Sequence, residues 1–158
     1  VKEYANVVVT RTFSKAYGLA GLRSGFALAQ PALIEILNRI RPPFNMNTAA
    51  QAAAAACIDD AAFLERVYKE NRAGVETLET FFKEQAIRYL PTTANFVLAQ
   101  TGPKTAELNT ELLKRGVIVR PVKSYGLSDW LRVSVGTARE NARFIEAFQA
   151  ARKALGLI

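Results

Sequence analysis

The fold class of this chain is decided by one stretch, Thr12-Phe13-Ser14-Lys15-Ala16-Tyr17-Gly18-Leu19-Ala20-Gly21-Leu22-Arg23-Ser24-Gly25. It follows Val7-Val8-Val9, a run of β-branched residues typical of a buried strand. Open α/β sheets bind ligands at the carboxyl ends of their strands, so we expect Ser14 and Lys15 at such an end. Lysine forms Schiff bases with carbonyl cofactors, and Ser14 and Arg23 suit a phosphate group. The alternative interpretation is a surface lysine in a glycine-rich turn.

The composition excludes several kinds of site. The 158 residues contain no histidine and a single cysteine, Cys57. Catalysis by Ser-His-Asp or Cys-His, the usual zinc sites and an internal disulfide are therefore not expected, and we predict no metal. A lone cysteine fits a reducing compartment, so we predict a cytoplasmic protein.

Charge and hydropathy argue against two classes of partner. The net charge is +7, but the basic residues are scattered rather than clustered, so no nucleic-acid partner is expected. The longest apolar run, 52–58, is too short to span a bilayer, and no leader of basic and apolar residues opens the sequence. Because the sequence starts with Val1 rather than methionine, we expect a truncated start.

The first part of the chain predicts two strands followed by two helices. Strands are expected at 7–12 and 26–29, and Pro31 opens a helix over 32–40. Thr48-Ala49-Ala50-Gln51 has the form of a capping box for a helix that runs to about Ile58.

A long amphipathic helix follows. Asp59-Asp60 can cap it, and it should run to about Gln85. One stripe at spacings of three and four is expected to face inward, and it comprises Leu64, Val67, Tyr68, Asn71, Val75, Leu78 and Phe82.

After Pro91 the pattern predicts a small α+β domain with a three-stranded sheet packed against helices. The expected strands are 95–99, 117–120 and 131–135. The expected helices are 105–115, ended by Gly116, and one that opens with a capping box at 137–140.

The glycines do not fit the common phosphate motifs. Gly18, Gly21 and Gly25 lack the spacing of the dinucleotide fingerprint and of the P-loop. Together with Ser14-Lys15 and Arg23 they resemble the cofactor-attachment motif of the fold-type I, class I/II pyridoxal-phosphate (PLP) aminotransferases. The stretch is similar in particular to the histidinol-phosphate aminotransferases. The similarity continues through 43–47, 94–96, 116–120 and 131–137.

The resemblance implies a role for each candidate residue. Lys15 would attach the cofactor and carry the proton of the reaction, and Ser14 and Arg23 would bind its phosphate. Arg132 would bind the anionic group of the substrate by a bidentate pair, with Arg120 as a second arginine and Asn95 near the substrate. The alternative for both arginines is a cation at a sheet edge with its stem packed on the domain.

The resemblance also implies the organisation of the protein. The fold would be α/β, with residues 1–60 ending a large mixed-sheet PLP-binding domain, 61–85 forming a bridging helix and 86–158 forming the small α+β domain. The family's remaining cofactor ligands lie upstream of the lysine, and a tyrosine comes from a second subunit. We therefore expect the C-terminal portion of a homodimeric enzyme, inactive by itself.

The implied reaction converts histidinol phosphate and 2-oxoglutarate into imidazole-acetol phosphate and glutamate, in histidine biosynthesis. An aromatic aminotransferase or a PLP-dependent decarboxylase of a phosphorylated amino acid is the alternative within the fold. In another class, an aminotransferase-like domain would sense a ligand in a transcriptional regulator.

Overall fold

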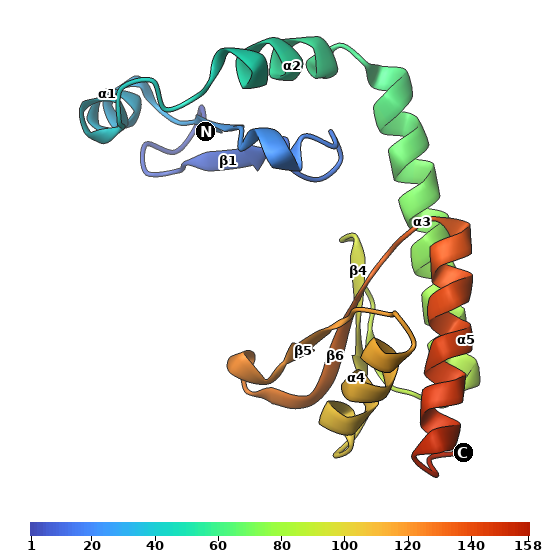
Figure 1. The fold of residues 1–158 in the computed structure, drawn as a ribbon. Helices are drawn as coiled ribbons and strands as arrows, with labels where there is room; N and C mark the ends of the chain where they lie inside the picture. Colours follow the sequence, from blue (N-terminus) through green and yellow to red (C-terminus); the bar gives the residue numbers. More distant parts are fainter. The chain divides into compact units, whose positions relative to one another are not determined.

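The computed structural model describes all 158 residues, and it contains two compact units. Unit 1 comprises Val1–Tyr68 and unit 2 comprises Lys69–Ile158. The boundary falls inside helix α3 (Ala61–Glu84), which contributes residues to both units. Figure 1 shows the order of the elements along the chain. The assignment of 1–60 and 86–158 to separate enzyme domains, with a bridging helix between them, stays a prediction.

Unit 1 is built on a two-stranded antiparallel ribbon. Strand β1 (Val9–Thr12) pairs with β2 (Gly25–Leu28), and the register places Thr12 opposite Gly25. A short 3-10 helix, η1 (Ala20–Leu22), lies in the loop between them. Helices α1 (Pro31–Ile40) and α2 (Thr48–Ile58) follow, with Pro31 in the first turn of α1 as predicted.

The predicted burial of the first strand is wrong for this structure. Every residue of β1 and β2 is exposed, including Val9 and Phe26 with exposed fractions of 38% and 40%. No further strand pairs with β1 or β2, and no helix of unit 1 buries the apolar side chains of this ribbon. The valine run therefore predicts the strand correctly, but it does not predict whether other segments bury that strand.

The start of α2 also differs from the prediction. Asn47, not Thr48, is the N-cap, because its side chain accepts a hydrogen bond of 2.8 Å from the backbone N–H of Ala50. Gln51 donates to the carbonyl of Met46 instead of closing a capping box. Asparagine satisfies a free helix N–H as well as threonine does, so the helix begins at Thr48 itself. The cap predicted for the next helix is confirmed at Asp60, which accepts from the N–H of Phe63.

Unit 2 contains a four-stranded antiparallel sheet in the order β3-β4-β6-β5. The strands are β3 (Tyr89–Leu90), β4 (Phe96–Gln100), β5 (Arg120–Val122) and β6 (Leu127–Ser134). Three strands were expected; the fourth, β3, is only two residues long and carries no alternation of its own. The strand expected at 117–120 begins only at Arg120, and a short 3-10 helix, η2 (Lys123–Tyr125), leads from β5 into β6.

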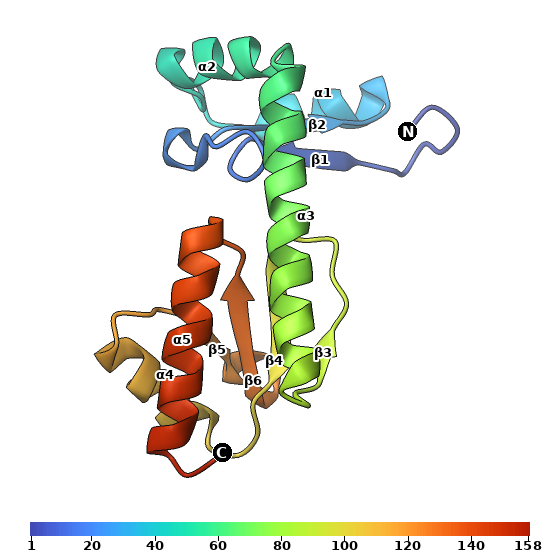
Figure 2. The same cartoon turned by 90° about the vertical axis from the view of Figure 1, so that its right-hand side faces the viewer.

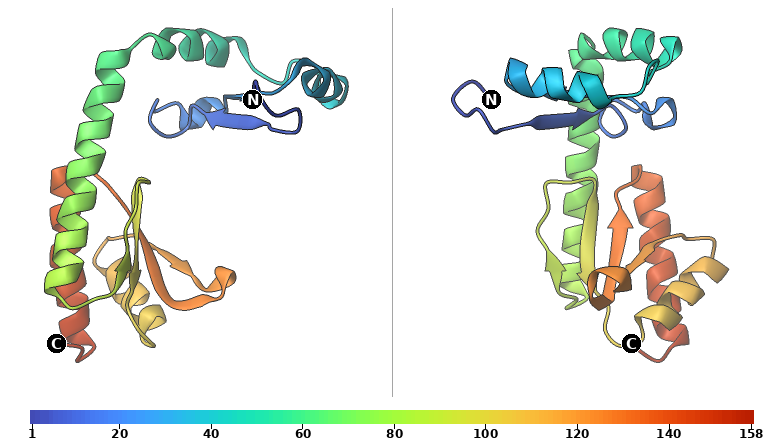
Figure 3. Two further views of the ribbon diagram at one scale, coloured as in Figure 1. Left: turned by 180° about the vertical axis from the view of Figure 1, so that it is seen from behind. Right: turned by 90° about the vertical axis from the view of Figure 1, so that its left-hand side faces the viewer.

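Helices cover one face of this sheet. Helix α4 (Thr105–Lys114), helix α5 (Ala138–Ala154) and the second half of α3 supply the covering side chains. Figures 1 and 2 show α5 running beside α3, and Figure 3 shows the sheet beside them from behind. The capping box predicted for α5 is present between Thr137 and Glu140.

The core of unit 2 is aromatic. Phe81, Phe82, Phe144 and Phe148 form a cluster of tilted and edge-to-face ring contacts between α3 and α5. Val97, Ala99, Leu131 and Val133 of the sheet and Leu108 and Leu112 of α4 complete the buried cluster. Tyr68, predicted to face inward, is 66% exposed. No helix of the structure is long and apolar enough to cross a membrane.

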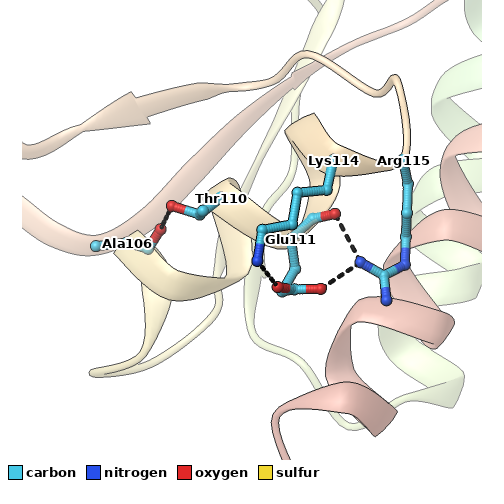
Figure 4. Close-up of polar contacts among 5 residues, drawn as sticks. All are labelled: Ala106, Thr110, Glu111, Lys114 and Arg115. Atoms are coloured by element: carbon cyan, nitrogen blue, oxygen red, sulfur yellow. Dashed lines mark hydrogen bonds and ion pairs between the residues drawn. The ribbon is translucent and has the colours of Figure 1, made fainter.

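Charged side chains at the surface of α4 form ion pairs with one another. Glu111 forms ion pairs with Lys114 and Arg115, and Arg115 also donates to the Glu111 carbonyl at 2.8 Å (Figure 4). The hydrogen bond from Lys114, followed by that from Arg115, lowers the pKa of the Glu111 carboxyl below its ordinary value of 4.5. These pairs close the C-terminal end of α4, where cations are favourable.

Candidate functional site

The loop that carries Lys15 is closed by its own backbone. The N–H of Phe13 donates to Ser24 O at 3.1 Å, and the N–H of Leu19 donates to Phe13 O at 2.9 Å. The N–H of Gly18 donates to Lys15 O at 2.9 Å, and Gly18 adopts φ +70°, a left-handed conformation that favours glycine. These bonds form a tight turn with Lys15 on its exposed side.

A small aromatic cluster supports the loop from within. Phe13 is 3% exposed, and its ring lies 5.0 Å from that of Tyr17 and 5.7 Å from that of Phe26. Phe13 and Ser14 lie in the bend that follows β1. Ser14 is half-buried and its N–H donates to the Thr12 hydroxyl. Tyr17 therefore packs against the Phe13 ring.

Arg23 lies at the far end of the same loop. It adopts φ +55°, a conformation uncommon for a residue with a side chain, and its Nη1 donates to Ala20 O at 2.8 Å. This bond uses one of the five guanidinium N–H groups and fixes the orientation of the rest. The close approach of strand β2 explains Gly25, since a Cβ there would lie 2.6 Å from Arg11 O.

The charged residues of the loop and of its flanking strands are all positive. No aspartate or glutamate occurs between Glu3 and Glu35, whereas Arg11, Lys15 and Arg23 all fall in that interval. None of the three cations forms an ion pair in the structure. A cationic loop with a hydroxyl, exposed donors and glycines that permit close approach fits a bound phosphate group.

In unit 2 the structure brings the two predicted arginines together. Arg120 of β5 is the direct cross-strand partner of Arg132 of β6, and Arg132 in turn is opposite Leu98 of β4. Leu98 alternates with the buried Val97 and Ala99, so Arg120 and Arg132 lie on the sheet face that the helices leave uncovered. Like charges placed directly opposite each other repel.

Arg132 is oriented by an aromatic ring. Its guanidinium carbon lies 5.1 Å from the centre of the Phe96 ring, and its Nε is buried without a hydrogen-bond partner. Neither arginine forms an ion pair. An oxyanion bound by the exposed ends of both guanidinium groups would relieve the repulsion between them. Two adjacent guanidinium groups thus fit a phosphate or a carboxylate.

Asn95 immediately precedes β4 and its side chain is exposed. Its carbonyl accepts a hydrogen bond of 2.9 Å from the N–H of Val135, one residue beyond β6. This bond extends the β4–β6 ladder and places Asn95 next to Phe96, the ring beneath Arg132.

Sequence reasoning missed two features of this site. The role of Phe96 as the platform of Arg132 was not predicted, although an aromatic residue in an alternating strand was a usable signal. The pairing of Arg120 with Arg132 could not be predicted from the sequence, because the register of β5 and β6 shifts between Pro121 and Val122 at a bulge.

A separate groove lies on the helical side of unit 2, with a volume of about 750 Å³. It is lined by Val117, Ile118 and Val119 on one side and by Val135, Gly136 and Arg139 on another. None of the predicted site residues lines it.

Comparisons with known proteins identify the family of this chain. Residues 1–148 match the family described as Aminotransferase class I and II. The chain is 51% identical over 97% of its length to histidinol-phosphate aminotransferase 1 of Cupriavidus pinatubonensis, covering 42% of that protein. It is 53% identical over 93% of its length to histidinol-phosphate aminotransferase 1 of Thiobacillus denitrificans, covering 38% of that protein. The chain thus spans about two fifths of the length of these curated relatives.

Solved structures show the same fold. The crystal structure of a protein described as a histidinol-phosphate aminotransferase of Erwinia carotovora matches with a TM-score of 0.90 and 28% identity over 98% of this chain and 44% of that one. The histidinol-phosphate aminotransferase of Sinorhizobium meliloti, in complex with pyridoxal-5'-phosphate, matches with a TM-score of 0.89 and 27% identity over 97% of this chain and 43% of that one. The predicted α/β class of the fold-type I PLP enzymes is confirmed, and the chain belongs to the class I and II aminotransferase family.

Proposed function

We propose that this chain forms part of a PLP-dependent aminotransferase that acts on histidinol phosphate and 2-oxoglutarate in histidine biosynthesis. The observation that best supports this substrate is the Arg120–Arg132 pair, because two guanidinium groups without ion-pair partners on one sheet face suit a phosphate. About 50% identity to several histidinol-phosphate aminotransferases supports the same substrate over the alternatives.

The cofactor assignment rests on the Lys15 loop. Ser14 and Arg23 bind the phosphate of PLP through a hydroxyl and the guanidinium donors that Ala20 leaves free. When bound, PLP supplies an aldehyde that bonds amines and a ring that withdraws electrons from the substrate. Lys15 is the residue that attaches the cofactor, and its exposed Nζ is not engaged in any ion pair.

Proton transfer is assigned to the same lysine. The Nζ of Lys15 would accept the proton from the substrate α-carbon and deliver it to the C4′ carbon of the cofactor. Histidine cannot share this task within these residues, since the chain contains none.

The anion end of the substrate is assigned to unit 2. Arg132 forms the bidentate contact, oriented by the Phe96 ring. Arg120 adds the second charge, and Asn95 lies at the strand end next to Phe96. The same pair accepts the carboxylate of glutamate or 2-oxoglutarate in the second half of the reaction.

The protein is proposed to be a cytoplasmic homodimer, because the family site needs a tyrosine from a second subunit. Small molecules, an amino donor and a 2-oxo acid, are its proposed partners, with no nucleic acid, membrane or metal. Because the chain spans about two fifths of the length of its curated relatives, it is proposed to be inactive by itself.

The test is a half-reaction assay of the holoenzyme with histidinol phosphate and, separately, phenylalanine. We expect the visible band of the cofactor to disappear with either substrate, but with a kcat/KM at least about a hundredfold higher for histidinol phosphate than for phenylalanine. Phenylalanine has no phosphate, so it would leave the charged donors of the arginine pair unpaired, which is costly. A higher kcat/KM with phenylalanine would instead identify an aromatic aminotransferase.

A further inference from the structure

Two asparagines of unit 2 bind the backbone next to the proposed substrate residues. The Nδ2 of Asn71, on α3, donates to Ala94 O at 3.1 Å, one residue before Asn95. Asn141, on α5, binds both polar groups of Gly136: its Oδ1 accepts from the N–H at 2.9 Å and its Nδ2 donates to the carbonyl at 3.0 Å. These contacts fix the segments that enter β4 and leave β6.

The two contacts belong to one connected network. Asn95 O accepts from the N–H of Val135, which directly precedes Gly136. The loop before Asn95 is held at a second point, where the N–H of Thr92 donates to Glu79 Oε1 at 3.3 Å on α3. The start of β4 and the end of β6 are therefore tied to each other and to two helices.

Close packing leaves this network little freedom. Asn141 is 3% exposed. Gly74 lies three residues after Asn71 on the same face of α3, and a Cβ there would overlap Val135 and lie 2.8 Å from Asn141 Nδ2. The helix backbone thus touches the turn that follows β6 directly, which requires glycine at this position.

We infer that Asn71 and Asn141 are positioning residues for substrate recognition, holding Asn95 and the Phe96–Arg132 stack in the geometry that binds the phosphate of the substrate. The path is short: Ala94 is two residues from Phe96, and Gly136 is four residues from Arg132 on the same strand exit. The inference rests on the proposed function.

The network sets the geometry of the substrate residues in addition to supporting the fold. An amide that donates to Ala94 O sets where the chain turns into β4, and hence where the Phe96 ring lies under Arg132. A displacement of about 1 Å at a recognition group can lower a rate or affinity roughly a hundredfold without unfolding the protein.

The experiment compares Asn71→Leu and Asn71→Asp with the parent holoenzyme, and Asn141→Leu as a third variant. Leucine keeps the shape and removes the amide; aspartate keeps the shape and replaces the donor with a carboxylate facing Ala94 O. Thr105→Val is the matched control, because Thr105 is 2% exposed and donates to Gly102 O at 2.6 Å at the opposite end of β4.

Each protein is measured for KM and kcat with histidinol phosphate, for binding of inorganic phosphate by calorimetry, and for urea unfolding. We expect KM and the phosphate Kd to rise roughly tenfold or more in both Asn71 variants, with the cofactor band and kcat changed much less. Thr105→Val should lose stability but keep the parent KM and Kd.

The inference is overturned if both Asn71 variants keep the parent KM and phosphate Kd, or if Thr105→Val changes them to the same extent. Should Asn141→Leu fail to fold, the Asn71 variants still decide the outcome. A parent that binds phosphate but does not react with histidinol phosphate contradicts the proposed function alone, because phosphate binding then still tests the positioning role.

Discussion

Arg120 and Arg132 lie directly opposite each other across the antiparallel strands β5 and β6, with no carboxylate paired to either. Such a pair of like charges is unfavourable to folding, and its presence on an uncovered sheet face supports the proposed anion site. The guanidinium group of Arg132 is also oriented by the Phe96 ring, whose centre lies 5.1 Å from its central carbon.

Removing one charge of this pair should stabilise unit 2. For Arg120→Gln we expect the free energy of unfolding to rise by a few tenths to about 1 kcal/mol in a buffer without phosphate, because cross-strand repulsion is lost. Adding phosphate should stabilise the parent and not the variant. Urea titrations with and without phosphate measure both effects.

The control for this variant is Arg143→Gln. Arg143 forms an ion pair with Glu146 at 3.1 Å and donates to Arg115 O at 2.8 Å, so its removal should not stabilise the protein. Equal stabilisation by both changes would show that the gain reflects net charge, not the cross-strand pair.

Lys15 should be indispensable for the bound state of the cofactor. In Lys15→Ala we expect the visible band formed after adding PLP to be lost, since the band requires the lysine amine. Lys153→Ala, which removes an exposed lysine at the end of α5, should keep it. A band of parent intensity in Lys15→Ala would reject the assignment of this lysine.

Gly74→Ala should destabilise the protein despite its position in a helix. Alanine is ordinarily favoured over glycine in a helix by about 0.5–1 kcal/mol, but here its methyl group would overlap Val135. Overpacking of this kind costs about 1–3 kcal/mol, so we expect a net loss in urea unfolding.

The neighbouring exposed position calibrates this result. Ala73→Gly removes a methyl group in the same turn and reports the helix-propensity term alone. If Gly74→Ala raised stability by the amount that Ala73→Gly lowers it, the close approach of α3 to Val135 would be disproved.

Acid should weaken the start of α5. The N–H of Thr137, followed by its hydroxyl, donates to the Glu140 carboxylate and lowers its pKa below the ordinary value of 4.5. A carboxyl with a lowered pKa in the folded state contributes stability above its unfolded pKa, and that contribution is lost as the pH falls through the folded pKa.

Glu140→Gln therefore should flatten the fall in stability below about pH 4.5 and lower the plateau above it. Thermal unfolding between pH 3 and pH 7, roughly the range in which such a carboxyl titrates, measures the difference. An identical pH profile in the parent and the variant would contradict the capping role of this carboxylate.

Local structure could be predicted well from the sequence, whereas the segments that lie next to each other in space could not. Capping signals located the starts of α3 and α5 at Asp60 and Thr137, because an N-cap depends only on residues within one turn. The burial of β1 and the existence of β3 could not be read, since both depend on which segments lie alongside them. Asn47 replaced Thr48 as a cap because both residue types satisfy the same helix N–H.

The candidate site shows the same limit. The Lys15 loop is contiguous in sequence, so its residues could be named together from the motif alone. The relation between Arg120 and Arg132 depends on a bulge at Pro121 and Val122, and that between Arg132 and Phe96 on the β4–β6 register. Pairing of this kind is set by tertiary contacts.

The most direct test of the central claim is the preference for histidinol phosphate over histidinol in the parent holoenzyme and in Arg120→Gln. Loss of a hydrogen bond to a charged group costs about 1.5–3 kcal/mol, so we predict that the ratio of the two kcat/KM values falls at least tenfold in the variant, with kcat/KM for histidinol nearly unchanged. A ratio that is the same in both proteins would contradict the claim that the arginine pair recognises the phosphate.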